Sequence, residues 1–118
     1  MKNPLEKFVR QHIIAFLRGH KIYAYVQRNT GLKVRNKCGR EKWIKANKLG
    51  IPDIVGFFGA SWGNHAGKAV YIEVKREKNY KVSPAQELFI NTAKEAGCFA
   101  MIAHSMEDVQ EELKKWKE

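Results

Sequence analysis

The sequence has few cysteines and no long hydrophobic run, and both shortages limit what the chain can be. Cys38 and Cys98 lie far apart and neither belongs to a CxxC pair, so we expect two free thiols rather than a disulfide framework or a structural zinc site. The longest aliphatic and aromatic run covers only residues 13–17, too short for a membrane span or for the apolar part of a signal peptide. We therefore expect an intracellular, cytoplasmic protein with no membrane partner.

Acidic residues are scarce relative to basic ones: 12 Asp and Glu stand against 22 Lys and Arg, which leaves a net charge of +10. The excess is concentrated in residues 28–48, where eight basic residues accompany a single acid, Glu41. A block of this kind favours contact with nucleic acid phosphates; the alternative is a solubilising surface with no partner. Gly31 and Gly39 within the block indicate an exposed hairpin or loop.

The length of 118 residues and the hydrophobic content of 44% suit one domain with one core, over residues 1–118. Apolar periodicity predicts three helices and four strands, in this order: a helix at 3–19, strands at 22–28, 50–58 and 69–76, a helix at 83–97, a strand at 99–103 and a helix from 105. Residues 59–68 are expected to form a glycine-rich loop. The first three strands can pair antiparallel, whereas the fourth returns through a helix and should lie parallel to its neighbour. We expect an α/β fold: a mixed four-stranded sheet with helices on both faces.

Two acidic residues and a lysine stand out in the central strands. Alternation places Tyr71, Glu73 and Lys75 on one face of their strand, and Tyr71 is expected to pack on the sheet. Asp53 lies in a largely apolar strand, where an acid is costly unless it is paired or bound to a metal. If the two strands pair, Asp53 and Glu73 converge.

Converging carboxylates repel each other, and a divalent cation removes that repulsion. Hard oxygen ligands select Mg²⁺, or Mn²⁺ in its place, over zinc. Lys75 would then orient or deprotonate an attacking water, or offset charge in the transition state. The alternative is a surface ion pair between Glu73 and Lys75 on an edge strand, which would contribute little.

These residues resemble a known motif. Pro52-Asp53 followed by Glu73-Val74-Lys75 resembles the PD-(D/E)XK nuclease motif. With Gly50 and the segment Ser83-Pro84-Ala85-Gln86 added, nearly the whole chain is similar to the virus-type replication–repair nuclease (VRR-NUC) domain. The resemblance implies a restriction-endonuclease-like core of order αβββαβα. It also implies a Mg²⁺-dependent endodeoxyribonuclease that acts as a homodimer on branched DNA such as a Holliday junction, in a bacterial cell or a phage-infected host, without a small-molecule cofactor.

The resemblance also assigns site residues. Those that it implies are the metal ligands Asp53, Glu73 and Glu6, the backbone carbonyl of Val74 as a further ligand, the catalytic Lys75, and Gln86 at the rim of the active site. Glu6 and Gln86 have a simpler alternative, because each stands third in a helix after a capping residue and would stabilise the helix N-terminus there.

Basic and polar residues that flank this group are expected to contact DNA. They are Arg28, Asn29, Lys33, Arg35, Lys37, Lys48, Arg76, Lys81 and Ser83. Trp43 and Trp62, in the two predicted loops, are expected to stack on an unpaired base or to pack at a dimer interface. Two alternatives to a junction nuclease stay open: a basic nucleic-acid-binding module without catalysis, and a flap or other structure-specific nuclease of the same fold.

Overall fold

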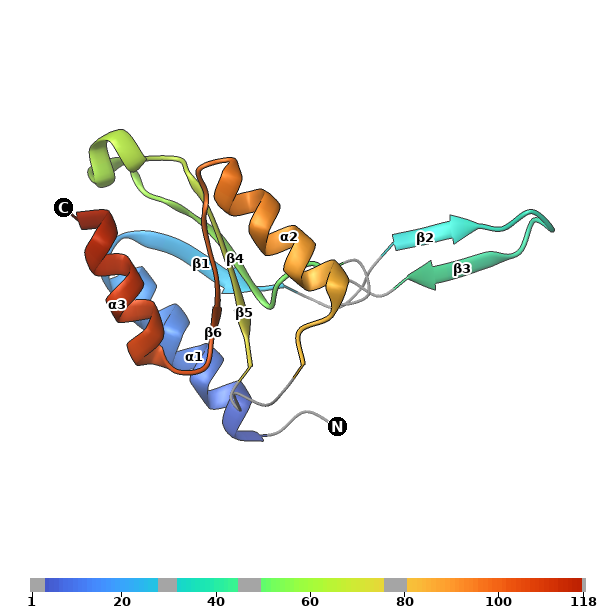
Figure 1. Cartoon of the computed structure of the whole chain (residues 1–118), viewed down its shortest axis with the longest axis horizontal. Coiled ribbons are helices and arrows are strands. Elements are labelled where there is room, and N and C mark those ends of the chain that lie inside the picture. The colour runs from blue at the N-terminus through green and yellow to red at the C-terminus, as the bar shows by residue number, and fades with distance from the viewer. Residues whose placement is uncertain (1–3, 28–31, 45–49, 76–80, 118) are drawn as a thin grey trace.

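The main sheet contains four strands in the order β1–β4–β5–β6 (Figure 1). The strands are β1 (Ile22–Val26), β4 (Ile54–Phe58), β5 (Ala69–Val74) and β6 (Phe99–Ala103). β4 pairs antiparallel with both β1 and β5, whereas β5 pairs parallel with β6. The mixed sheet predicted from the sequence is therefore confirmed. This computed structural model describes residues 4–27, 32–44, 50–75 and 81–117.

Three helices cover the sheet. On one face, α1 (Pro4–Gly19) and α3 (Met106–Lys117) pack over the main core. On the other face, α2 (Pro84–Glu95) packs on β5 and β6 over a smaller core that includes Ile90, Ala93 and Ala100. Because successive strand residues point to opposite faces, Val70, Ile72 and Val74 enter the main core while Tyr71 and Glu73 face α2.

The predicted basic hairpin or loop is a hairpin that projects from the domain (Figure 1). Strand β2 (Leu32–Arg35) pairs antiparallel with β3 (Glu41–Ile44), and the two form a sheet of their own. The turn is held by Asn36, whose side-chain oxygen accepts hydrogen bonds from the backbone N–H groups of Cys38 and Arg40. Gly39 has a φ of 80°, which glycine adopts without strain.

Some predicted boundaries were wrong. The strand predicted at 50–58 begins only at Ile54, because Gly50 has a φ of 82° and Pro52 cannot donate to a strand ladder. The strands predicted at 22–28 and 69–76 end at Val26 and Val74.

The segment predicted as a glycine-rich loop at 59–68 contains a 3₁₀ helix over Ala60–His65. Trp62, within that segment, is partly buried and packs against the main core. Its indole N–H donates to the carbonyl of His20 at 2.7 Å, and its ring meets Phe58 edge-on at 5.0 Å. Both cysteines are free thiols, as predicted. In the described parts of the chain, no helix is long and apolar enough to cross a membrane.

Candidate active site

Asp53 and Glu73 meet where β4 begins and β5 ends. The pairing of Ile54 with Ile72 places Asp53, the residue before β4, opposite the end of β5. The backbone N–H of Asp53 donates to Glu73 Oε1 at 3.2 Å, and the backbone N–H of Val74 donates to Asp53 Oδ2 at 3.2 Å. Each carboxylate is therefore fixed by the backbone of the other strand, and the predicted convergence of the two acids is confirmed.

Glu73 is a buried acid with an altered ionisation. Its side chain is only 5% exposed. Burial and, next, the nearby charge of Asp53 together raise the pKa of Glu73 to about 7, although Lys75 acts in the opposite direction. The group therefore holds a proton close to neutral pH unless a cation takes the place of that proton. The alternative of an edge-strand surface pair does not hold, because β5 is a central strand and Glu73 is buried.

Lys75 follows β5 and projects to the same side as Glu73. Its Nζ lies 3.5 Å from Glu73 Oε2, and its side chain is 20% exposed. The lysine therefore contacts the buried carboxylate and also reaches solvent, where a substrate could approach. An ammonium group so placed can stabilise negative charge or act on a water molecule.

The sequence did not identify the contacts that hold the backbone of Lys75. Its N–H donates to the carbonyl of Ala103 at 2.9 Å, and its carbonyl accepts from His104 Nδ1 at 2.5 Å. The backbone N–H of His104 in turn donates to Asp108 Oδ2 at 2.8 Å. Lys75 is thus tied to β6 and to the first turn of α3. No sequence signal indicated this, because His104 is an isolated histidine without metal or triad spacing.

The first turn of α2 forms the rim of the site. Ser83 Oγ accepts from the N–H of Gln86 and Gln86 Oε1 accepts from the N–H of Ser83, both at 3.1 Å, so the capping interpretation of Gln86 is confirmed. An open groove of about 880 Å³ runs from Lys75 past Lys81 to this turn. Two lysines and a helix N-terminus make the groove suitable for an anion such as a phosphate.

Gly50 explains why the segment before Asp53 can lie against α2. A Cβ at this position would lie 2.3 Å from the carbonyl oxygen of Ala85, and the φ of 82° is also unfavourable for other residues. Glycine is therefore required for the close approach between this segment and the first turn of α2. The same approach sets Asp53 beside the rim.

Glu6 lies in the first turns of α1, a helix that contacts β5. Its carboxylate is 3.6 Å from Arg10 Nη1, and both side chains are nearly buried. No group of three His, Cys, Asp or Glu residues that could hold a metal occurs within the described segments. The structure thus brings Asp53 and Glu73 together without adding Glu6, whose role as a ligand stays a prediction. Its capping partner, Asn3, lies outside the described residues.

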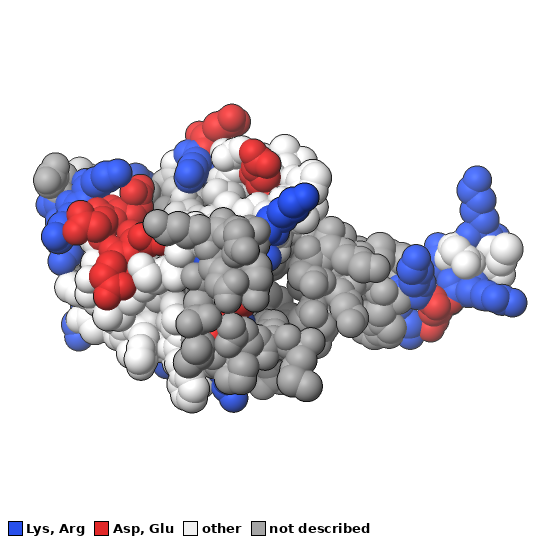
Figure 2. All heavy atoms as spheres, turned by 60° about the horizontal axis from the view of Figure 1, so that its bottom comes forward, with Lys and Arg blue, Asp and Glu red and all other residues white. Residues whose placement is uncertain are grey.

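Five of the nine residues predicted to bind DNA lie in the described segments, and these five occupy two places. Lys33 and Arg35 lie on β2 and Lys37 in the hairpin turn, all exposed, and Figure 2 shows basic side chains gathered at this end of the molecule. Glu41 pairs with Lys33 at 2.7 Å and with Arg35 at 3.5 Å, so it neutralises part of this charge. Two further residues line the groove at α2, and four lie outside the described segments. The groove residues are Lys81 and Ser83, and those outside are Arg28, Asn29, Lys48 and Arg76.

Comparison with known proteins identifies one family. No curated protein and no solved structure matches the chain. The family model of the VRR-NUC domain matches residues 6–107, a span that begins at Glu6 and includes Asp53, Glu73, Lys75 and His104. Since this match covers most of the chain and the sheet has the expected order, the chain belongs to the VRR-NUC domain family, which consists of nucleases of the PD-(D/E)XK type.

Proposed function

We propose that the chain is a divalent-metal-dependent endonuclease that hydrolyses phosphodiester bonds in branched DNA. The observation that carries this proposal is the meeting of Asp53 and Glu73 beside Lys75, at a groove suited to phosphate. Family membership supports nuclease chemistry on DNA. The metal, the residue roles and the branched substrate are the proposed parts.

The donor set fits a hard divalent cation. Two carboxylates converge, and burial together with the charge of Asp53 raises the pKa of Glu73 to about 7, so that the pair is strained when both groups are ionised. Mg²⁺ is commonly held by one or two carboxylates, with water and substrate oxygens filling its other positions. Asp53 and Glu73 would hold the ion, with Glu6 and the carbonyl of Val74 as further proposed ligands. When bound, the ion supplies Lewis-acid stabilisation of charge on the phosphoryl group.

The remaining roles belong to side chains at the rim. Lys75 orients or deprotonates the attacking water, or offsets the charge that develops on the phosphate, and its contact with Glu73 keeps the ammonium group in place. Gln86 is held by the capping box and keeps the first turn of α2 in position. Lys81 and Ser83 would bind a backbone phosphate next to the one that is cut.

The basic hairpin supports a preference for DNA shape. It projects from the domain (Figure 1). It also carries exposed Lys33, Arg35 and Lys37, so that DNA could be held at the hairpin and at the groove together. Phosphate contacts at two separated places select the path of the backbone rather than the base sequence. A four-way junction offers two equivalent strands, which suits a homodimer with two sites.

The test is a panel of labelled linear, flapped and four-way DNAs, each incubated with Mg²⁺, with Mn²⁺ or with a chelator. We expect the four-way junction to be cut with either metal and no DNA to be cut with the chelator. Binding without cleavage under every metal and pH condition would overturn the nuclease assignment. Faster cleavage of the flapped DNA would overturn the junction preference and leave the metal-dependent chemistry in place.

A further inference from the structure

The parallel ladder between β5 and β6 stops beside Lys75. Its last register pair is Val74 with Ala103, and the N–H of Lys75 adds one more rung by donating to the carbonyl of Ala103 at 2.9 Å. Because β6 ends at Ala103, the strand backbone does not continue to the point where it would meet the carbonyl of Lys75. That carbonyl is nevertheless bonded, since His104 Nδ1 lies 2.5 Å from it. The imidazole thus takes the place of the next rung.

This contact determines which nitrogen of the His104 ring carries a proton. A carbonyl oxygen can only accept a hydrogen bond, so Nδ1 must be the donor. The neutral ring with its proton on Nδ1 and the imidazolium both meet this requirement. The bond to Lys75 therefore forms whether or not the ring is charged, and it can hold the backbone of the lysine permanently.

His104 is itself attached to the first turn of α3. Its backbone N–H donates to Asp108 Oδ2 at 2.8 Å, and the N–H of Asp108 donates to Ser105 Oγ at 3.4 Å. The same helix packs on the main core through Val109 and Leu113. The ring is therefore connected to a helix that the core holds in place, which gives Lys75 a firm support.

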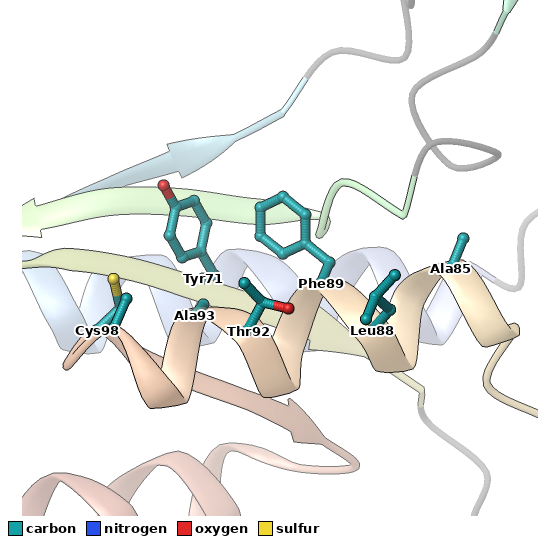
Figure 3. A pocket seen from close by; sticks show the side chains of 8 residues that line it. Tyr71, Ala85, Leu88, Phe89, Thr92, Ala93 and Cys98 are labelled. Atoms are coloured by element: carbon teal, nitrogen blue, oxygen red, sulfur yellow. The ribbon is translucent and has the colours of Figure 1, made fainter.

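On the other side of β5, the neighbours from α2 are apolar. The ring of Tyr71 meets that of Phe89 edge-on, with centroids 5.0 Å apart, and Leu88 and Ala93 line the same pocket of about 460 Å³ (Figure 3). Leu88, Phe89 and Ala93 pack there, but their side chains carry no hydrogen-bond donor. The donor for the carbonyl of Lys75 comes instead from the side of β6, where His104 lies.

We infer that His104 is a positioning residue for the proposed reaction, because it holds the backbone of Lys75 so that the ammonium group stays beside Glu73. Lys75 Nζ lies 3.5 Å from Glu73 Oε2, at the end of a long side chain that is 20% exposed. The direction of such a side chain depends on the peptide group from which it starts. A displacement of about 1 Å in a group that acts on the reacting atoms can lower a rate about a hundredfold.

This inference rests on the proposed function, and two variants of similar shape test it. His104→Asn keeps a donor, because the amide nitrogen of asparagine is as many bonds from Cα as Nδ1 of histidine. His104→Leu has a methyl group there and cannot donate. We expect His104→Leu to cut a labelled four-way junction in Mg²⁺ about tenfold more slowly in a single turnover, with Kd within about twofold of wild type. His104→Asn should cut within about threefold of the wild-type rate.

His12→Leu is the matched control, because it removes an exposed imidazole from α1 by the same substitution. It should cut at the wild-type rate. Circular dichroism confirms that each variant is folded, and His104→Ala provides the test if His104→Leu does not fold.

A double variant separates positioning from an independent effect. If His104 acts through Lys75, its removal should matter only while the lysine is present. Lys75→Ala combined with His104→Leu should therefore cut no more slowly than Lys75→Ala alone. Independent contributions would multiply and make the double variant about tenfold slower again.

A second readout needs neither DNA nor metal. In proton–nitrogen NMR spectra, the hydrogen-bonded Nδ1–H of His104 should give a slowly exchanging signal. In protein with carbon-labelled lysine, the Cε signal of Lys75, assigned through Lys75→Arg, should move in His104→Leu and return towards its wild-type position in His104→Asn.

Wild-type cleavage by folded His104→Leu would overturn the inference and leave the proposed nuclease intact. Equal losses in the Asn and Leu variants, or a multiplied loss in the double variant, would overturn it in the same way. A chain that shows both NMR effects but cuts no DNA would contradict the proposed function, while the hold of His104 on Lys75 would stand.

Discussion

Among single residues, Glu73 is an acid with unusual surroundings. It is buried next to another carboxylate, and these surroundings raise its pKa to about 7 from an ordinary value of 4.5. Lys75 lies 3.5 Å away but acts against this shift without abolishing it. A bound cation would favour the ionised form of Glu73 and so lower this pKa.

The raised pKa of Glu73 has a consequence for stability. Because the pKa of Glu73 is higher in the folded protein than in the unfolded chain, its contribution to stability is fully present below about pH 4.5 and is lost as the pH rises through about 7. Glu73→Gln keeps a neutral side chain at every pH. Between pH 5 and pH 8 in chelator, the free energy of unfolding of this variant should rise relative to wild type by a few kcal/mol, at about 1.4 kcal/mol per pKa unit.

Urea unfolding at the two pH values measures this difference. The control is Glu87→Gln, because Glu87 is an exposed acid on α2 and the variant should follow the wild-type pH dependence. Mg²⁺ should stabilise wild type at pH 8 and have a smaller effect on Glu73→Gln. Parallel pH curves for wild type and Glu73→Gln would show that Glu73 ionises normally.

At the scale of elements, the site depends on the contact between the segment before β4 and the first turn of α2. Gly50→Ala introduces a Cβ that would lie 2.3 Å from the carbonyl oxygen of Ala85, so one of the two segments must move. We expect a loss of about 2 kcal/mol or more in the free energy of unfolding, together with slower cleavage, because Asp53 and the rim shift relative to each other.

Gly67→Ala separates this clash from backbone strain. Gly67 has a φ of 81°, almost equal to the 82° of Gly50, but a Cβ there meets nothing within 4 Å. It should cost only the left-handed strain, about 1 kcal/mol, and should leave cleavage unchanged. Chemical unfolding and cleavage rates of the two variants provide the comparison; equal effects would show that the contact with α2 is unimportant.

The hairpin is the second element with a testable role. The triple variant Lys33→Ala, Arg35→Ala, Lys37→Ala removes three exposed cations from it. If they contact phosphates, junction binding should weaken and the slope of log Kd against log salt should fall by up to about 3. Binding titrations with a labelled junction at several salt concentrations measure both quantities.

The control for the hairpin removes the same charge elsewhere. Lys114, Lys115 and Lys117 are exposed on α3, and their replacement by Ala lowers the net charge equally. This variant should keep most of the wild-type slope. Equal slopes for the two triple variants would mean that the hairpin acts only through overall charge.

Much of this arrangement could be predicted from the sequence, because it follows from local periodicity. The two-residue alternation of β5 places Val70, Ile72 and Val74 on the face opposite Glu73. The apolar stripes in the sequence indicate where each helix lies along the chain. The convergence of Asp53 with Glu73 followed from strand pairing. The capping box at Ser83 was also visible as a pattern of neighbouring residues.

The remaining features depend on contacts between distant segments, which periodicity does not encode. His104 reaches the carbonyl of Lys75 only because β6 lies parallel to β5. Trp62 packs against the main core, and its indole N–H donates to the carbonyl of His20, which is distant in the sequence. Gly50 could be recognised as part of a motif, but its need for close approach to Ala85 becomes clear only when α2 is in place.

At the scale of the whole molecule, charge and apolar surface are separated. The basic hairpin extends the domain along its longest dimension, 53 Å against 30 and 21 Å, and the groove at Lys75 and Lys81 provides a second cationic region. Tyr23 and Tyr25 of β1 and Phe57 of β4 are about half-exposed and form an uncharged surface. The cationic regions proposed to bind DNA are therefore separate from this uncharged surface.

The most direct test of the account is cleavage of a labelled four-way junction in Mg²⁺ by wild type, Lys75→Ala and Asp53→Asn, with junction binding measured on the same samples. We expect both variants to bind with nearly the wild-type Kd and to cut at least about a hundredfold more slowly, since each loses a group that acts on the reacting phosphate or water. Wild-type cleavage rates in the folded variants would contradict the assigned roles. Loss of binding and folding in step with activity would show that Asp53 and Lys75 serve the structure rather than the reaction.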